Sequence, residues 1–345
     1  MGKYSIDAFE VHPLVKLRPV TTKPGATSFR LLELHQAELE TAELLAPPPV
    51  EGEKVILLLH LNEKSDLADA CGFVRRMGSC YEGGKGFVAV VMATGTFTGV
   101  AREQLVQAYA QGFDETFLLA EPGMGAAEIC RRMGVPFGLW LELDRGILNL
   151  RRCIGQEKLA RVWEKCPVYL HSGRNLTEEE LDAARRWHIS GADMLLPYGG
   201  HMTLRRMMFP KGLTTGGMMP LRLWWQNIGT APIYDLLLLQ LELRCGENRY
   251  EIEAPGLLEH PGVGDSTMNL LAKLPEVPCG NYELWIGLKT GEKFLSLAMD
   301  AQEDGGMYRV GDVTLDEVVR PYLAAMWEAQ YADGYYPLED PAQPE

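Results

Sequence analysis

The sequence predicts an α/β region followed by an all-β region, namely a reduced or incomplete (β/α) TIM-like barrel and then an antiparallel β-sandwich. A chain of 345 residues exceeds what one apolar core usually organises. Short apolar runs alternate with amphipathic segments up to about residue 200, and only strand-like runs follow. We therefore expect an α/β domain over residues 1–204, a sandwich with a terminal helix over 205–330, and an acidic tail over 331–345.

The α/β region contains six expected strands, with a further strand expected at residues 28–35. The six cover residues 55–61, 87–94, 115–120, 137–143, 167–171 and 192–198. The expected helices cover residues 66–77, 102–111, 126–133, 156–165 and 178–187, and Thr177 with Glu180 predicts a capping box. Six units are too few for a full barrel of about 250 residues. An open doubly wound sheet is the alternative, disfavoured because no G-x-G-x-x-G loop follows a strand.

The second region has strand-like segments separated by Gly, Pro, Asn and Asp turns. They cover residues 219–227, 235–245, 249–253, 268–274, 282–289, 294–299 and 307–315. A terminal helix is expected to begin at Asp316. The Met-rich segment just before, residues 202–209, is expected to form an apolar seam between the two domains.

Two motifs in this region point to a known architecture. Residues 225–234 read W-Q-N-I-G-T-A-P-I-Y, and residues 280–284 read G-N-Y-E-L. Residues 195–315 thereby resemble a bacterial domain family of unknown function, a β-sandwich that follows a glycoside-hydrolase-like barrel. The resemblance implies a carbohydrate-related role for the preceding barrel. The motif itself is interpreted as architectural, with Asn227 and Gly229 in a turn that needs positive φ.

Composition narrows the classes of ligand and location. The net charge of −14 repels phosphate backbones and argues against a nucleic-acid partner. No apolar run reaches the ~20 residues that span a bilayer, and the start of the chain lacks the apolar core of a secretory signal. The seven scattered cysteines predict mostly buried free thiols and a reducing, cytoplasmic compartment. The expected partner is a small molecule or an oligosaccharide.

Candidate catalytic residues are sought at the carboxyl ends of the expected strands, where (β/α) barrels carry their reactive groups. Glu121 and Glu142 end consecutive expected strands, so they are the predicted catalytic pair of a glycoside hydrolase. The period-two rule places Trp140, Glu142 and Asp144 on one strand face, where Trp140 would stack on a sugar ring. In the alternative interpretation, Glu121 begins a surface loop, and Glu142 or Asp144 forms an ion pair with Arg145 or Arg151.

His60, His171 and Tyr198 lie at other strand ends and complete the predicted substrate-binding set, with Trp140 and Asp144. Two imidazoles with Glu121 or Glu142 are suitable donors for a divalent metal, but no H-x-H or H-E-x-x-H spacing is present. We expect neither a metal nor another cofactor. The sequence thus predicts a glycoside-hydrolase-like protein that binds or acts on a glycan or glycoside; the alternative is a non-catalytic carbohydrate-binding or scaffold protein with a degenerate barrel.

Overall fold

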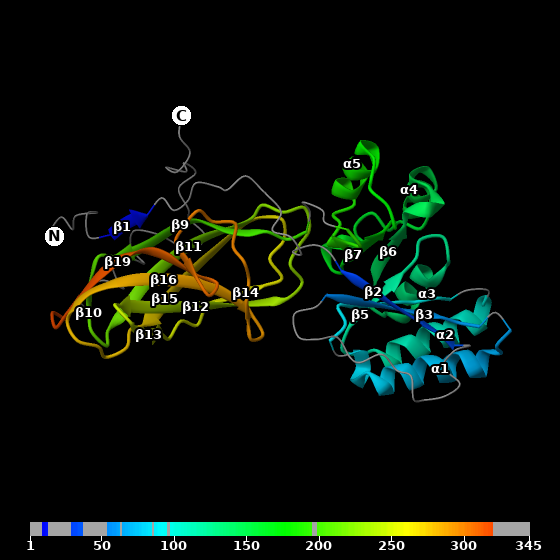
Figure 1. Ribbon diagram of the computed structural model, residues 1–345, viewed down its shortest axis with the longest axis horizontal. Helices are drawn as coiled ribbons and strands as arrows, with labels where there is room; N and C mark the ends of the chain where they lie inside the picture. Colours follow the sequence, from blue (N-terminus) through cyan, green and yellow to red (C-terminus); the bar gives the residue numbers. More distant parts are fainter. Residues whose placement is uncertain are drawn as a thin grey trace. The chain divides into compact units, whose positions relative to one another are not determined.

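The structure is a computed structural model that describes residues 9–12, 29–36, 54–62, 64–84, 86–94, 97–194 and 199–319. The chain divides into two compact units (Figure 1). The first, here called the α/β unit, contains Thr22–Gly199 and Thr230–Pro232. The second, the all-β unit, contains Met1–Thr21, Gly200–Gly229 and Ile233–Glu345.

A seven-stranded parallel sheet forms the centre of the α/β unit. Its strands are β2 (Arg30–His35), β3 (Val55–His60), β4 (Ala89–Val91), β5 (Phe117–Ala120), β6 (Gly138–Glu142), β7 (Val168–His171) and β8 (Gly191–Ala192). They lie side by side in chain order, and every neighbouring pair is parallel. A doubly wound sheet reverses its strand order at a switch point. The sequential order therefore argues against that alternative.

The parallel sheet is curled. The amide of Phe29, directly before β2, donates a hydrogen bond of 3.0 Å to the carbonyl of Ala192 in β8. The Phe29 ring also lies 5.8 Å from that of Trp140 in β6 and 5.6 Å from that of Tyr169 in β7. Contacts between the beginning of the first strand and the last three strands require the sheet to bend back on itself.

Helices cover the outer face of this sheet. They are α1 (Leu67–Cys80), α2 (Gly99–Gly112), α3 (Ala126–Met133), α4 (Ile147–Gln156) and α5 (Glu178–Arg186), with short 3₁₀ turns at Glu82–Gly84, Leu143–Arg145 and Val162–Glu164. A Cβ added to Gly78 of α1 would lie 2.0 Å from the carbonyl oxygen of Gly112, so glycine is required for the close approach of α1 and α2.

Most of the predicted helices are confirmed, and one is wrong. The capping box of Thr177 and Glu180 begins α5. The helix expected at residues 156–165 lies instead at Ile147–Gln156, because Leu150 and Ile154, one turn apart, are the residues that it buries. No helix in the described part of the chain is both long and apolar enough to span a bilayer.

The two faces of the sheet have separate cores. Leu139 and Leu141 of β6 belong to the large cluster beneath the helices. Trp140 belongs to a smaller cluster on the inner face, with Phe29, Ile56 and Leu119 among its members. The alternation predicted for this strand is therefore confirmed from Leu139 to Glu142.

The all-β unit consists of two sheets. One has the order β1-β9-β11-β15, comprising Phe9–His12, Met202–Pro210, Met218–Asn227 and Gly264–Lys273. The other has the order β10-β19-β16-β12-β13, comprising Gly212–Thr214, Met307–Asp316, Gly280–Thr290, Leu236–Cys245 and Asn248–Ile252. Three short strands pair at its margins: β14 (Leu257–Glu259), β17 (Lys293–Phe294) and β18 (Glu303–Asp304). One apolar core draws on both sheets, as in a sandwich.

Several details of this unit differ from expectation. β10 and β19 are parallel, so the second sheet is not wholly antiparallel. The Met-rich segment is strand β9, and its apolar residues lie in the core of the all-β unit. Neither Asn227 nor Gly229 has positive φ; the Asn227 side chain instead accepts hydrogen bonds from the amides of His201 and Gly229. Asp316 ends strand β19, and the expected terminal helix and tail beyond Val319 lie outside the described residues.

All seven cysteines are free, as predicted. Cys71, Cys130 and Cys166 are buried, whereas Cys80, Cys245 and Cys279 are exposed. The expectation that most are buried is therefore wrong.

Candidate functional site

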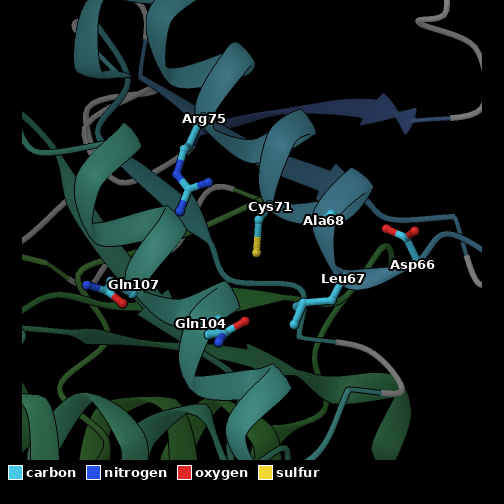
Figure 2. A pocket seen from close by; sticks show the side chains of 7 residues that line it. All are labelled: Asp66, Leu67, Ala68, Cys71, Arg75, Gln104 and Gln107. Atoms are coloured by element: carbon cyan, nitrogen blue, oxygen red, sulfur yellow. The ribbon is translucent and has the colours of Figure 1, made fainter.

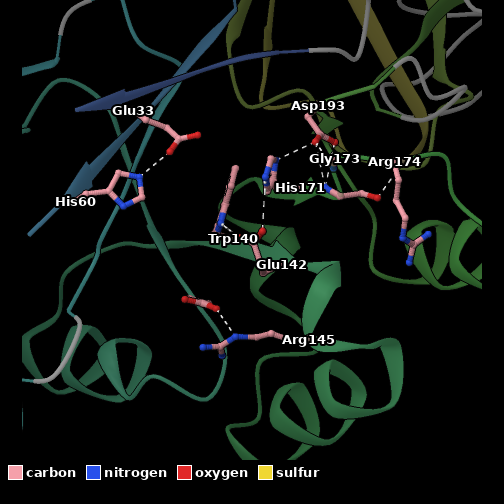
Figure 3. Close-up of polar contacts among 11 residues, drawn as sticks. Glu33, His60, Trp140, Glu142, Arg145, His171, Gly173, Arg174 and Asp193 are labelled. Atoms are coloured by element: carbon pink, nitrogen blue, oxygen red, sulfur yellow. Dashed lines mark hydrogen bonds and ion pairs between the residues drawn. The ribbon is translucent and has the colours of Figure 1, made fainter. Parts of the chain in front are cut away.

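Polar side chains gather at the carboxyl edge of the curled sheet. We call them the carboxyl-edge cluster, and they are Glu33, His35, His60, Glu121, Glu142, Arg145, His171 and Asp193. They belong to the ends of β2, β3, β6 and β7 and to the residues directly after β5, β6 and β8. The strands are all parallel, so their carboxyl ends lie at one edge. Figure 3 shows much of this arrangement.

Glu142 is held by its two neighbours. The indole Nε1 of Trp140 donates a hydrogen bond of 2.8 Å to Oε2 of Glu142 (Figure 3). His171, which pairs with Glu142 in the register of β6 and β7, places Nε2 3.6 Å from the other carboxylate oxygen. The rings of Trp140 and His171 stack with centroids 5.4 Å apart. Both oxygens of Glu142 therefore face a hydrogen-bond donor or a potential cation.

Asp193 holds the other side of His171. Its Oδ2 lies 2.9 Å from Nδ1 of His171, and it accepts hydrogen bonds from the amides of Ser172 and Gly173. The contact with Asp193 raises the pKa of His171, burial opposes this rise, and the charges of Glu142 and Glu33 add to it. Burial acts to raise the pKa of Asp193, but the contact with His171 and the two amides outweigh it and lower the pKa. The arrangement favours an imidazolium between two carboxylates.

Glu121 has a different environment. It forms an ion pair with Arg145, with 2.8 Å between Oε1 and Nε, and its side chain is only 21% exposed. Burial raises the pKa of Glu121, Arg145 opposes the rise, and the charge of Glu142 adds to it. Glu121 is therefore close enough to sense Glu142, and its proton is harder to remove than that of an ordinary glutamate.

A third group lies on β2 and β3. Nε2 of His60 lies 2.8 Å from Oε2 of Glu33, and the rings of His35 and His60 stack in parallel at 4.2 Å. Glu33 and His35 alternate to the same face of β2, and His35 is the register partner of His60.

The structure relocates three of the predicted site residues. Trp140 is 2% exposed, with Phe29 and His171 against it, so its ring cannot be the sugar platform that the sequence predicted. Asp144 lies exposed in the 3₁₀ turn after β6 and leaves the face shared by Trp140 and Glu142, because strand alternation ends at Glu142. Tyr198 lies outside the described residues.

The expected ion pairs are also different. Arg145 pairs with Glu121, and Arg151 pairs with Glu179, so neither holds Glu142 or Asp144. The sequence reasoning missed Glu33, His35 and Asp193. Glu33 and His35 were detectable as alternate residues at the end of the first strand. Asp193 was hidden because the last strand was placed at residues 192–198, whereas it ends at Ala192.

Two hollows lie near or apart from this cluster. One, beside the cluster, is lined by Gly173, Arg174, Asn175, Asp193 and Met194. The other is an open groove between α1 and α2, shown in Figure 2 and lined by Asp66, Leu67, Ala68, Cys71, Arg75, Gln104 and Gln107. No residue of the carboxyl-edge cluster lines this groove. Its side chains offer no group with the chemistry expected of the site.

No family model matches the chain, so the resemblance of residues 195–315 to a domain family stays a prediction. No curated protein matches it. Among solved structures, a β-glucosidase from Listeria innocua in complex with glucose has a TM-score of 0.25 and 11% identity, over 88% of this chain and 48% of that chain. A β-glucosidase from Erythrobacter marinus has a TM-score of 0.25 and 10% identity, over 89% and 49% of the two chains. A CARDB domain from Pyrococcus furiosus, with a TM-score of 0.24 and 9% identity, covers 35% of this chain and 99% of its own. All of these likenesses are weak.

Proposed function

We propose that the curled sheet is a reduced (β/α) barrel and that its carboxyl-edge cluster binds a sugar and cleaves a glycosidic bond. The observation that carries this proposal is the difference between Glu121 and Glu142. Burial raises the pKa of Glu121, while Glu142 contacts the indole of Trp140 and faces His171. Glycoside hydrolysis needs one carboxyl group that keeps its proton and one that is ionised.

In this proposal, Glu121 protonates the oxygen of the leaving group, and Glu142 supplies the negative charge that stabilises the developing oxocarbenium ion. Trp140 is a positioning residue, because it holds one oxygen of Glu142 from within the sheet. His171 and Asp193 offer donors and acceptors to sugar hydroxyls beside the hollow at Gly173–Met194. Arg145 must release Glu121 when a ligand enters.

The ion pair of Arg145 with Glu121 favours a second candidate function. A guanidinium at 2.8 Å stabilises the carboxylate form of Glu121 and opposes its use as an acid. A protein in which this pair persists would bind a sugar at the same cluster without turnover. This non-catalytic alternative shares the site and differs only in the chemistry.

The test is hydrolysis of a broad panel of aryl glycosides by the wild type and Glu142→Gln. We expect the wild type to release the aryl group from at least one member, and Glu142→Gln to reduce kcat by about 10²- to 10⁴-fold. The matched control is Glu115→Gln, because Glu115 is exposed before β5, whereas Glu121 follows the same strand. Equal rates in the wild type and Glu142→Gln would contradict the catalytic proposal. Sugar binding without any turnover would establish the alternative.

A further inference from the structure

The ends of β2 and β3 bring together three side chains with the donor atoms of a transition-metal site. Glu33, His35 and His60 each offer one ligand atom, and these atoms all lie within 4.8 Å of one another. Two imidazoles and one carboxylate form a common protein set for zinc and related divalent ions. The spacing is not contained in one short motif, because His60 comes from a different strand.

The backbone fixes this arrangement. Glu33 and His35 are two residues apart on β2 and so point to one face. His35 and His60 are aligned in the parallel register, which places their rings 4.2 Å apart and within 6° of parallel. Neighbouring strands of a sheet thus supply all three ligands, and only side-chain rotation remains to be adjusted.

The distances fit an ion after small movements. Two ligand atoms bound to zinc at about 2.1 Å in a tetrahedral arrangement lie about 3.4 Å apart. The widest pair of donor atoms, up to 4.8 Å, must therefore close, and the 2.8 Å contact of His60 with Glu33 must open. Glu33 and His35 are exposed and His60 is half-buried, so these rotations meet little packing resistance and an ion can enter from solvent.

We propose that Glu33, His35 and His60 bind one divalent transition-metal ion of the zinc class. Three protein ligands leave a further coordination position for water or for an oxygen atom of a bound molecule. Imidazole donors select such ions over magnesium and calcium, which prefer oxygen ligands alone. The site does not depend on the proposed hydrolysis, since neither Glu121 nor Glu142 belongs to it.

The test uses the full-length chain without a purification tag, with its thiols alkylated, because Cys80, Cys245 and Cys279 are exposed and bind zinc themselves. Titration with Zn²⁺ by calorimetry should show one tight site per chain. Titration with Co²⁺ should give visible absorption bands. Equal concentrations of Mg²⁺ or Ca²⁺ should not displace the ion.

Glu33→Gln, His35→Gln and His60→Gln should each weaken Zn²⁺ binding at least about 10- to 100-fold, since losing a ligand costs no less than losing a residue that orients one. The matched control is His260→Gln, an exposed histidine of the all-β unit, which should bind like the wild type. Melting of every variant in a chelator confirms that it is folded. The proposal is overturned if the wild type binds no more tightly than a His35→Gln, His60→Gln double variant, or if alkylation alone abolishes binding.

Discussion

Each unit of the molecule contains a buried tryptophan, and the two are used differently. Trp140 in the α/β unit is 2% exposed, and its indole nitrogen donates to Glu142 at the sheet edge. Trp225 in the all-β unit is 0% exposed, and its indole nitrogen has no hydrogen-bond partner among the residues that the structure describes. One tryptophan orients a carboxylate, and the other fills a core.

The charged groups of the two units follow the same division. In the all-β unit, Arg244 is buried between Glu242 and Asp304, with its guanidinium 3.9 Å from the ring of Trp285. That network is local and internally neutralised. In the α/β unit, acids and imidazoles from several strands meet at one partly exposed edge. Convergence of partly exposed groups, more than their number, distinguishes a candidate site from a structural network.

The comparison is tested most strongly at Trp225. Trp225→Ala should lower the free energy of unfolding by about 3–5 kcal/mol, because it leaves a cavity in the core of the all-β unit. Trp224→Ala is the matched control: that side chain is half-buried and donates to Asp265, so its loss should cost about 1 kcal/mol. Urea unfolding followed by circular dichroism measures both. Equal losses would show that Trp225 is not a core residue in the sense described.

A smaller effect is expected from the His171–Asp193 pair. The pKa of His171 is raised, so its contribution to stability is complete below its ordinary value of 6.5 and is lost as pH rises through the folded pKa. The pKa of Asp193 is lowered, so its contribution is present above 3.8 and is lost as pH falls through the folded pKa.

Asp193→Asn should therefore destabilise the protein more at pH 5.5 than at pH 8. The difference should stay below about 1 kcal/mol because the pair is partly exposed. Melting temperatures at the two pH values measure it, with Asp182→Asn, in an exposed pair of α5, as the control. A cost that is the same at both pH values would exclude an imidazolium at His171.

Much of the fold was accessible from sequence because its strands are short apolar runs between turns. All seven parallel strands and all five helices of the α/β unit have expected counterparts, except that one helix was placed about ten residues too late. Strand β9 was missed because all nine of its residues are buried, including Thr203, Arg205 and Arg206. A strand buried on both faces does not alternate, and its two arginines interrupt the apolar run.

The site was predictable only in part. Glu121, Glu142, His60 and His171 were found because strand ends can be located to within a few residues. Whether their side chains pair with one another, and with which partners, depends on register and curl, which no local pattern encodes. Asp193 and the group on β2 and β3 needed the paired strands. Trp140 was assigned to the correct face but not to the correct depth.

The claim that the carboxyl-edge cluster is the sugar site is tested most directly by calorimetric titration with a panel of mono- and disaccharides. The two decisive variants are His171→Ala in the cluster and Trp224→Ala, which removes the half-buried tryptophan of the all-β unit. Loss of a charged hydrogen-bonding group predicts a Kd about 10- to 100-fold higher in His171→Ala, with binding unchanged in Trp224→Ala. Unchanged binding in His171→Ala, with a loss in Trp224→Ala, would place the sugar on the other unit and contradict the account.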